Sequence, residues 1–342
     1  MHDFSSPFSD DRSIVLMTGA TGALGPRVVE AFGQSGYSVR VLALDPPEPG
    51  VLPTSVDVRL GDINNPKDIR AAVSGARFVL HMAAMQPILD PDPEKILFYE
   101  RVNVEGTRSV VKTALEADVQ KLVFFSTIAV YGGSAGHVLN ESTTPQPGTL
   151  YAQTKRQAEQ IVLDAYRPNG QAFGTVLRLA AVYGSRMKGN YRRLLQALAR
   201  RRFIPMGPGT NKRTMVYDKD AAGAALAVAG QSHAAGKVFN VTDGEIHSLN
   251  DIIQTICEAL GRKPPRMRLP VAPLRTAAGI MDKGSRLLGL RFPGLRSAID
   301  KYTEDLAVDG QRIQDEIGFR PKYDLLSGWK ETIEEMRARG DL

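Results

Sequence analysis

Cysteine is almost missing from this chain of 342 residues, and long apolar runs are missing altogether. The one cysteine, Cys257, cannot form an intrachain disulfide, which is typical of a reducing compartment, and we expect a cytoplasmic protein. No apolar run reaches the roughly 18–20 residues that span a bilayer. The opening stretch, MHDFSSPFSDD, has neither a basic nor an apolar segment, so we expect no secretory signal.

The composition is otherwise that of an ordinary globular protein. Hydrophobic residues make up 43% of the chain and charged residues 23%, which excludes collagen-like, coiled-coil and globally disordered proteins. At roughly 150 residues per domain, the length predicts two domains or one large one. Cys257 lies among apolar residues at helical spacing, so we expect a buried thiol without a catalytic role. We expect no metal site.

Positive charge is concentrated in the C-terminal half. The chain has 43 Lys and Arg against 37 Asp and Glu, a formal net charge of +6. Residues 186–213 contain nine basic residues and no acid, and residues 262–301 contain ten against two acids. Such a field favours an anionic ligand such as a phosphate, while a solvated basic face is an equal alternative. Neither stretch resembles a nucleic-acid reading motif, so we expect no nucleic-acid partner.

Short apolar runs alternate with amphipathic segments through the first half of the chain. This alternation predicts an α/β fold with a doubly wound parallel sheet of the Rossmann type, covered by helices on both faces. The predicted strands are 13–17, 38–44, 56–59, 78–81, 121–126, 174–179 and 238–241, and the predicted helices are 25–34, 66–73, 99–117, 151–166, 190–202, 248–260, 272–290, 309–317 and 328–339, with a turn and helix over 216–229.

After Gly184 the regular alternation of predicted strands and helices ends, and we expect a smaller α/β C-terminal domain that binds the substrate. The predicted division gives residues 12–183 and 214–243 to the dinucleotide-binding domain. Residues 184–213 and 244–338 then form the substrate-binding cap.

The segment from Ala272 to Leu290 is a candidate basic amphipathic helix. Such a helix could touch a membrane surface. We expect its apolar face to pack on the cap instead, so membrane contact is the less favoured alternative. The apolar residues concerned are Leu274, Ala277, Ala278, Met281 and Leu288.

A glycine-rich turn links the first predicted strand to the first predicted helix. It reads TGATGALG over residues 18–25, with glycines spaced G-x-x-G-x-x-G. Gly19 permits a tight turn, Gly22 lets the backbone approach a pyrophosphate, and Gly25 allows the helix to pack closely. The helix N-terminus supplies free N–H groups and a partial positive charge. We therefore predict a nucleotide site here.

Two acids follow the next strands. Asp45 stands where an acid suits a free ribose 2′-hydroxyl, which favours NAD and leaves NADP open, although Asp45 could equally be a turn residue before Pro46. Asp62 is a candidate for the adenine edge, and its alternative is a helix-capping residue.

Tyr151 and Lys155 lie four residues apart, on one face of a predicted helix. A free tyrosine titrates near pH ~10, and a neighbouring ammonium together with a nicotinamide cation would favour the phenolate. Ser126 and Thr127 end the preceding strand, at the sheet edge where ligands bind. Either hydroxyl could hydrogen-bond a substrate oxygen, or could simply bond to the backbone.

In these motifs and their order the chain resembles the extended short-chain dehydrogenase/reductases, the NAD-dependent epimerase/dehydratase group. The resemblance covers nearly the whole chain. The matching phrases are TGATGALG, HMAA (81–84), VNVEGT (102–107), STIAVYG (126–132), YAQTK (151–155), LRLAAVYG (177–184), VYDKDAAGA (216–224), FNVTDGE (239–245) and IGFRP (317–321).

The resemblance implies a role for each matching residue. Tyr151 is the proton donor or acceptor, Lys155 lowers its pKa and holds the nicotinamide ribose, and Thr127 takes the catalytic Ser/Thr position. Members usually form homodimers through two helices per subunit, here those starting near Tyr99 and Tyr151. The residues expected to line or support the cofactor are Gly19, Thr21, Gly22, Ala23, Leu24, Gly25, Asp45, Asp62, Ile63, Ala83, Ala84, Asn103, Ser126, Tyr151 and Lys155.

The substrate is less clearly indicated. Asn190 and Arg213 match positions that hold the diphosphate in nucleotide-sugar enzymes, but Ala181 replaces the usual asparagine of the LRLAAVYG phrase. We expect a small-molecule substrate, with a nucleotide sugar favoured and a steroid- or flavonoid-type ketone as the alternative. Ile128 and Ala129 stand where dehydratases carry Asp-Glu, which disfavours dehydration. A cofactor sensor without turnover is disfavoured because the Tyr–Lys pair is present.

Overall fold

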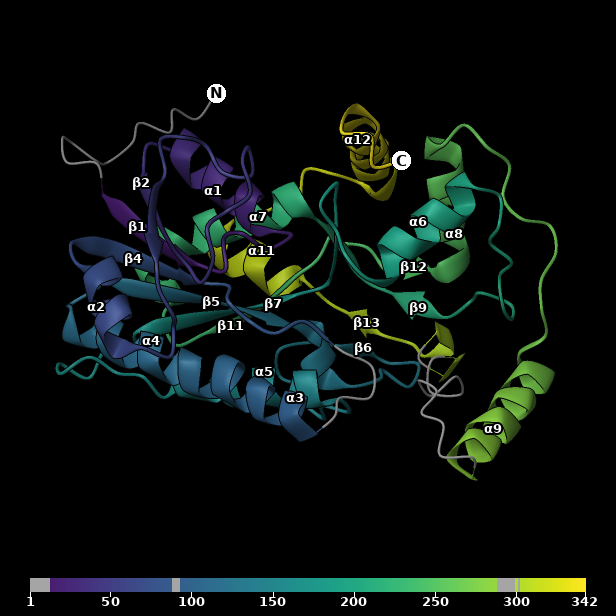
Figure 1. Ribbon diagram of the computed structural model, residues 1–342, viewed down its shortest axis with the longest axis horizontal. Helices are drawn as coiled ribbons and strands as arrows, with labels where there is room; N and C mark the ends of the chain where they lie inside the picture. Colours follow the sequence, from purple (N-terminus) through teal and green to yellow (C-terminus); the bar gives the residue numbers. More distant parts are fainter. Residues whose placement is uncertain (1–12, 88–92, 288–298, 301) are drawn as a thin grey trace.

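The computed structural model describes residues 13–87, 93–287, 299–300 and 302–342. A seven-stranded sheet forms the core of the larger half (Figure 1), and all its strand pairs are parallel. This confirms the predicted Rossmann-type α/β fold. In spatial order the strands are β11 (Val238–Val241), β7 (Gly174–Leu179), β5 (Lys121–Thr127), β4 (Ala76–His81), β1 (Ile14–Thr18), β2 (Ser38–Ala43) and β3 (Asp57–Leu60).

The strand order changes direction between β1 and β4, because β1 pairs with both β2 and β4. In open sheets of this kind the ligand binds beyond the carboxyl ends of the strands at such a switch point. The glycine-rich turn follows β1 at this position. The topology therefore places the predicted nucleotide site where a doubly wound sheet provides one.

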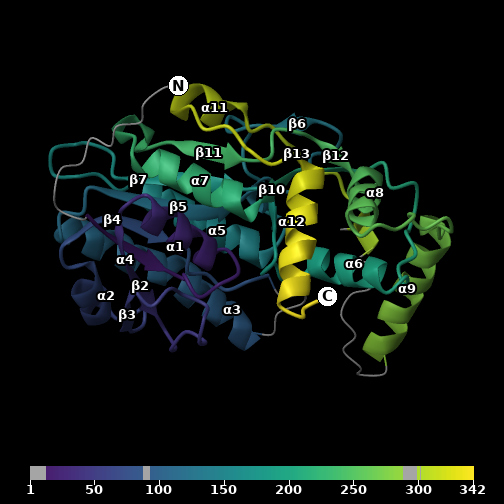
Figure 2. The same cartoon turned by 90° about the horizontal axis from the view of Figure 1, so that it is seen from above.

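Helices cover both faces of the sheet (Figures 1 and 2), and each face has its own apolar core. Val28 and Phe32, four residues apart, both point from one helix into the first core. Ile69 and Val110 belong to the second core. The first face carries α1 (Gly25–Gln34), α7 (Asp218–Ala229) and α11 (Gln311–Ile317), and the second carries α2 (Pro66–Val73), α4 (Gly106–Glu116) and α5 (Leu150–Leu163).

The predicted helix over residues 99–117 is interrupted in the structure. Helix α3 (Pro93–Tyr99) passes into a π-helical turn, Glu100–Glu105, before α4 begins at Gly106. A Cβ atom at Gly106 would lie 2.7 Å from the Ile63 side chain, so this turn approaches the loop after β3 closely. Hydrophobic periodicity does not distinguish π from α geometry over one turn, so the sequence predicted one continuous helix here.

The cap has a third apolar core, built around Trp329. The Trp329 ring stacks on Tyr183 with ring centroids 4.7 Å apart, and Cys257 is buried in the same core, as predicted. Tyr183, Met215 and Tyr217 belong to this third core, although the predicted division gives them to the dinucleotide-binding domain. Their strands, β8 (Ala181–Tyr183) and β10 (Met215–Tyr217), pair with each other, and β9 (Lys212–Arg213) pairs with β12 (His247–Ser248). The cap helices are α6 (Asn190–Ala199), α8 (Leu249–Ala259), α9 (Val271–Leu287) and α12 (Leu325–Ala338).

Part of the C-terminal region packs against the sheet. Val308, in β13 (Ala307–Val308), and Ile313 and Ile317 of α11 belong to the core of the first sheet face. Their side chains therefore pack with the nucleotide half, although the predicted division places them in the cap. The exact domain division stays a prediction.

Helix α9 packs less closely on the cap than predicted. Ala278 is buried and Leu274 is half-buried, but Ala277 and Met281 are exposed. Leu288 lies outside the described residues. The expectation that the whole apolar face packs on the cap is therefore wrong for Ala277 and Met281. None of the helices in the described part of the chain has the length and apolar character needed to cross a membrane.

Candidate active site

The glycine turn after β1 has no room for side chains at two of its glycines. Gly19 has φ +73°, and a Cβ atom there would lie 2.5 Å from the Ala83 nitrogen. A Cβ at Gly25 would lie 2.1 Å from the carbonyl oxygen of Ala20. The amide of Gly22 donates a hydrogen bond of 3.1 Å to the Gly19 carbonyl, which closes the turn. Glycine is thus required for the backbone path.

The N-terminus of α1 fits an anionic group. Its capping residue, Leu24, has no side-chain oxygen to accept the first amide hydrogens, and no acid lies in the first turn. Pro26 is placed in that turn without losing a helical hydrogen bond. The free N–H groups and the helix dipole are the features that hold a pyrophosphate. Thr21 is exposed and Ala23 half-buried beside them.

The two candidate acids stand beyond neighbouring strands. Asp45 is exposed just past the end of β2. Asp62 accepts hydrogen bonds from the backbone (2.8 Å) and side chain (2.9 Å) of Asn64, and the cap of α2 is Asn65. The helix-capping alternative for Asp62 is therefore wrong. Ile63 is buried directly behind it.

Asn103 joins three parts of the site. Its side-chain oxygen accepts a 2.8 Å hydrogen bond from the amide of Met85, in the loop that contains Ala83 and Ala84. Its side-chain nitrogen donates a 3.0 Å hydrogen bond to the hydroxyl of Thr154 on α5. Asn103 is buried and belongs to the π-helical turn. It therefore fixes the loop after β4 against the helix that bears Tyr151.

Helix α5 holds Tyr151 in its first turn, capped by the Thr149 hydroxyl. Burial raises the pKa of the Tyr151 phenol to about 12, and the nearby Tyr99 phenol adds to this. The phenol therefore keeps its proton at neutral pH. The predicted phenolate is not the favoured form in this structure, because no cation outweighs the loss of solvation.

Lys155 is buried one turn further along α5. Burial lowers its pKa to about 7, and the negative charge of Glu159 opposes this. Its ammonium donates a hydrogen bond to the Phe125 carbonyl and lies 3.9 Å from the centroid of the Phe124 ring. Lys155 is therefore held against the end of β5 and can change its protonation near neutral pH.

The two hydroxyls at the end of β5 have different surroundings. Ser126 is buried and donates a 2.6 Å hydrogen bond to Glu159. Thr127 is half-buried, and its oxygen accepts a 3.2 Å hydrogen bond from the Ala129 amide. Because this bond uses an oxygen lone pair, the hydroxyl proton of Thr127 remains available for a ligand. Of the two, Thr127 is the one that fits a substrate oxygen.

Sequence reasoning missed a polar cluster beneath the site. His81 contacts the hydroxyls of Thr18 (2.6 Å) and Thr107 (3.0 Å). Thr107 donates its proton to the Asn103 carbonyl, so it accepts from Nε2–H of His81, and Nδ1 accepts from Thr18. Burial, with the charge of Lys155, lowers the pKa of His81 to about 3. The HMAA phrase contained this residue, but only the fold shows its partners.

Two further residues were also missed. Tyr99 is buried and donates a hydrogen bond to the carbonyl of Gln86. Its phenol also helps to raise the pKa of Tyr151. Its position four residues before Asn103 on the helical face was the available signal. Arg178 forms a two-pronged ion pair with Glu159, at 2.9 and 2.7 Å. Nothing local in the sequence marked this pair, because its partners are far apart along the chain.

The predicted substrate residues lie in the cap. Asn190 is exposed at the first position of α6. The guanidinium of Arg213 donates to the carbonyls of Tyr302 (3.1 Å) and Glu304, and it hydrogen-bonds the phenol of Tyr191. The structure thus brings the start of α6 beside β9 through Tyr191.

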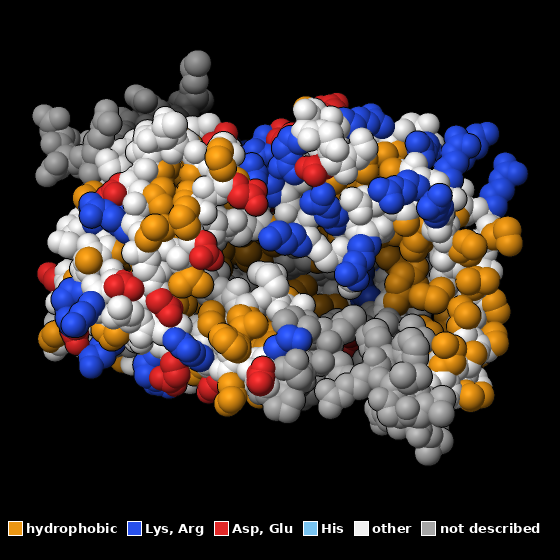
Figure 3. Space-filling view, in the orientation of Figure 1, with side chains coloured by type: hydrophobic (Ala, Val, Ile, Leu, Met, Phe, Trp, Pro, Cys, Tyr) orange, Lys and Arg blue, Asp and Glu red, His pale blue; other side chains and the backbone are white. Residues whose placement is uncertain are grey.

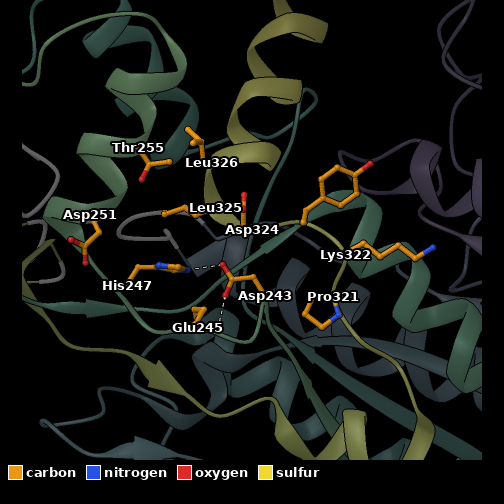
Figure 4. A pocket seen from close by; sticks show the side chains of 11 residues that line it. Asp243, Glu245, His247, Asp251, Thr255, Pro321, Lys322, Asp324, Leu325 and Leu326 are labelled. Carbon is orange, nitrogen blue, oxygen red and sulfur yellow. Dashed lines mark hydrogen bonds and ion pairs between the residues drawn. The ribbon is translucent and has the colours of Figure 1, made fainter.

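A cavity of about 460 Å³ lies elsewhere in the cap, between β12, α8 and the start of α12 (Figure 4). None of the predicted catalytic or cofactor residues lines it. Three of its four acids have partners: Asp243 contacts His247 at 2.7 Å, Asp251 caps α8, and Asp324 caps α12. These side chains hold the cap together, and the cavity is not the candidate active site.

Comparison with known proteins agrees with this geometry. The family model described as "NAD dependent epimerase/dehydratase family" matches residues 15–242. The N-acetyl-alpha-D-glucosaminyl-diphospho-ditrans,octacis-undecaprenol 4-epimerase of Escherichia coli O157:H7 is 27% identical over 323 residues, covering 94% of each chain.

Two further relatives differ in what their names describe. The 4-hydroxy-2-methyl-3-oxo-4-farnesyl-3,4-dihydroquinoline-1-oxide ketoreductase of Stigmatella aurantiaca is 26% identical, covering 89% of this chain and 91% of that protein. The solved structure "MoeE5 in complex with UDP-glucose and NAD" has a TM-score of 0.76 and 25% identity, covering 96% of this chain and 99% of that one. The resemblance drawn from the motifs is confirmed, and so is the expected cofactor of the family. The chain belongs to the NAD-dependent epimerase/dehydratase family and is an enzyme of the extended short-chain dehydrogenase/reductase type.

Proposed function

We propose that this enzyme moves a hydride to or from a secondary alcohol or ketone of a nucleotide sugar, as an epimerase or a reductase. The observation that carries the proposal is the group of Thr127, Tyr151 and Lys155 around the carboxyl end of β5. The adjoining strands β4 and β1 lead to the Asn103-fixed loop and the glycine turn. Proton-transfer groups and a dinucleotide cradle thus share one edge of the sheet.

The residues present fit NAD. The turn of Gly19, Gly22 and Gly25 would hold its pyrophosphate, Asp45 its adenosine ribose, and Lys155 its nicotinamide ribose. NAD, when bound, supplies the ring that accepts or donates the hydride. Asp45 supports NAD over NADP because an acid suits a free 2′-hydroxyl.

Tyr151 is the group that holds the transferred proton. Since its pKa is about 12 in this structure, the phenol is protonated at neutral pH and carries the proton that a carbonyl oxygen needs during reduction. In the oxidative direction Tyr151 must first lose its proton, so that its phenolate can accept the proton of the alcohol, and a protonated Lys155 would favour the phenolate by its positive charge. Thr127 donates its free hydroxyl proton to the same substrate oxygen and orients it.

The substrate class rests on the charge of the cap. Figure 3 shows the surface hollowed between the sheet half and the cap, with Lys and Arg side chains along the cap side. A basic rim favours a diphosphate-bearing substrate. Names of relatives support this, since one 4-epimerase acts on a diphospho-linked sugar and one solved relative is a complex with UDP-glucose. We infer that Asn190 and Arg213 contact the diphosphate.

The second candidate function is a ketoreductase acting on an apolar ketone. Ala181, in half-buried β8, lacks the amide that the family usually offers at this position. The Stigmatella relative is named as a ketoreductase of a farnesylated quinoline. An enzyme of this kind would use the same Tyr151 and Thr127 on a different substrate oxygen.

We also propose a homodimer in the cytoplasm. Helix α3 exposes Ile96, Leu97 and Phe98, an apolar stretch that a second subunit would cover. The lone buried Cys257 suits a reducing compartment. Size-exclusion chromatography with light scattering tests the dimer, and Leu97→Glu is expected to yield monomers.

A substrate panel tests the proposed reaction. The purified enzyme with NAD or NADH is offered nucleotide sugars, steroid ketones and flavonoid ketones, and turnover is read from the absorbance of the reduced cofactor and from product NMR. Turnover of nucleotide sugars only supports the proposal. Turnover of the apolar ketones only would transfer the assignment to the second candidate. Native mass spectrometry of the same protein identifies any cofactor that co-purifies.

A further inference from the structure

Five large apolar side chains are exposed together at the outer end of the cap. Two come from α9 and three from the loops before it and after α6, and each is between 37% and 72% exposed. Figure 3 shows this as an apolar area at the end of the molecule where α9 lies in Figure 1. We call it the apolar cap surface, and it consists of Ile204, Met267, Leu269, Ile280 and Met281.

The two loops of the apolar cap surface are tied to each other. Leu269 donates a 2.9 Å hydrogen bond to the Pro205 carbonyl and accepts a 2.8 Å hydrogen bond from the Gly207 amide. A parallel bridge joins Met206 to Leu269 at the same place. Helix α9 starts two residues after Leu269, and Figure 3 shows the apolar area extending over this end of the molecule.

Basic residues border the apolar cap surface and outnumber the acids of its segments, in which Asp282 of α9 follows Met281 directly. No Asp or Glu occurs in residues 186–217 or in residues 259–281. Arg275, on α9, pairs with Asp300, and Arg192 pairs with Asp341. Figure 3 shows Lys and Arg side chains gathered beside the apolar area. Within the part of the chain that the structure describes, six further basic residues of these segments are exposed and have no ion pair with a carboxylate, namely Arg200, Arg201, Arg202, Lys263, Arg266 and Arg268.

We propose that the apolar cap surface docks on an anionic lipid bilayer. Side chains such as Ile280 and Met281 would enter the boundary between headgroups and acyl chains, as in interfacial amphipathic helices. The bordering cations would contact anionic headgroups, each adding to the attraction. A second copy of the chain suits this surface poorly, because it would bring the same unpaired cations against one another.

Docking in this way leaves the catalytic half accessible. In Figures 1 and 2 helix α9 lies at the opposite end of the molecule from β1, α1 and the glycine turn. The nucleotide half would therefore face away from the bilayer. The inference rests on the cap surface alone and does not depend on which substrate the enzyme uses.

Vesicle binding tests the proposal with the full-length protein. Cosedimentation is measured with phosphatidylcholine vesicles and with vesicles that also contain phosphatidylglycerol, at low and high salt. We expect binding to the anionic vesicles to be about tenfold stronger than to neutral ones at low salt, and to weaken at high salt. Equal affinity for the two vesicle types, or none for either, would overturn the proposal.

Two double variants locate the contact. Ile280→Gln/Met281→Gln removes apolar area, and Lys263→Glu/Arg266→Glu reverses two charges. Each should weaken binding to anionic vesicles by about tenfold or more. The matched controls, Leu60→Gln/Tyr166→Gln and Lys67→Glu/Arg70→Glu, change exposed residues of the sheet half and should bind as the wild type does. Controls that lose binding equally would show that this surface is not the contact.

Sedimentation velocity without lipid tests whether a second copy of the chain covers the apolar cap surface instead. We expect the oligomeric state to be the same in the wild type and in Ile280→Gln/Met281→Gln. A wild-type oligomer that this variant dissolves would show that a second copy occupies the surface, which would overturn the proposal. Thermal unfolding of each variant confirms that it is folded before binding is compared.

Discussion

The hydroxyl of Ser126 donates its proton to the buried carboxylate of Glu159, at 2.6 Å. The oxygen of the next residue, Thr127, accepts a hydrogen bond from the backbone amide of Ala129, so the hydroxyl proton of Thr127 is not used in this bond. Successive side chains of a strand point to opposite faces, so only one of these neighbours can face a substrate. The proton of Ser126 is thus used within the protein, and the hydroxyl proton of Thr127 is available for the ligand contact that we propose.

This difference predicts that substitutions of the two neighbouring hydroxyl residues change different properties, turnover for Thr127 and stability for Ser126. Thr127→Val should lower turnover about a hundredfold, because it removes a hydrogen-bond donor to the reacting oxygen. Ser126→Ala should leave turnover within a few-fold but lower the free energy of unfolding by about 1–3 kcal/mol, because the buried Glu159 loses a partner. Steady-state kinetics and urea unfolding measure the two effects. Equal loss of activity in both variants would contradict the assignment.

Tyr151→Phe removes the only proton that Tyr151 can transfer. We expect turnover to fall at least about a hundredfold while the cofactor still binds, since the ring is kept and the glycine turn is untouched. Cofactor affinity is measured by fluorescence titration and turnover by steady-state assay. Unchanged turnover would reject Tyr151 as the proton donor or acceptor.

Lys155→Met should stabilise the cofactor-free protein while it abolishes activity. The native Lys155 has a pKa of about 7 against an ordinary value of 10.5, so between these values the unfolded chain binds more protons than the native one. Stability of the wild type therefore rises with pH across this window, and the cost of the buried ammonium is fully present below about pH 7.

Thermal unfolding across this pH range measures the effect. The melting temperature of Lys155→Met should exceed that of the wild type by several degrees near pH 6.5, where each kcal/mol is worth roughly 1–2 °C in a chain of this size. The difference should shrink as the pH approaches about 10. A difference that is constant with pH would show that packing, and not the charge, is responsible.

The glycines of α1 and its preceding turn predict a graded series. Gly25→Ala should fold poorly, because the new Cβ would lie 2.1 Å from a backbone oxygen. Gly22→Ala meets the Gly19 carbonyl at 3.1 Å, so it should fold but bind the cofactor more than about tenfold more weakly. Gly33→Ala is the control, since nothing lies within 4 Å of its Cβ, and it should stabilise the helix by about 0.5–1 kcal/mol. Titration and thermal unfolding separate the three variants.

The strand–helix alternation was sufficient to predict the sheet and the glycine turn. Local apolar runs such as 121–126 and the spacing of Gly19, Gly22 and Gly25 contain that information directly. The partners of Asn103, Glu159 and His81 could not be predicted, because each contact joins residues far apart along the chain or depends on side-chain direction at a strand end.

The protonation states of Tyr151 and Lys155 could not be predicted from the sequence either. The Tyr151–Lys155 spacing indicated an ion-assisted phenol, yet burial sets both pKa values in the structure and moves them in opposite directions. Likewise, the helical period of 272–290 indicated an apolar face, but only the fold shows that Met281 has no covering element among the described residues.

The turn of six residues that carries Asn103 has a consequence for insertions and deletions. A π-helical turn contains one residue more than the α-helical turn it replaces, and each residue of a helix corresponds to a rotation of about 100°. Removing a single residue from 100–105 would restore regular winding and swing the Asn103 amide away from both Met85 and Thr154. The length of this short stretch is therefore as constrained as its amino-acid identity.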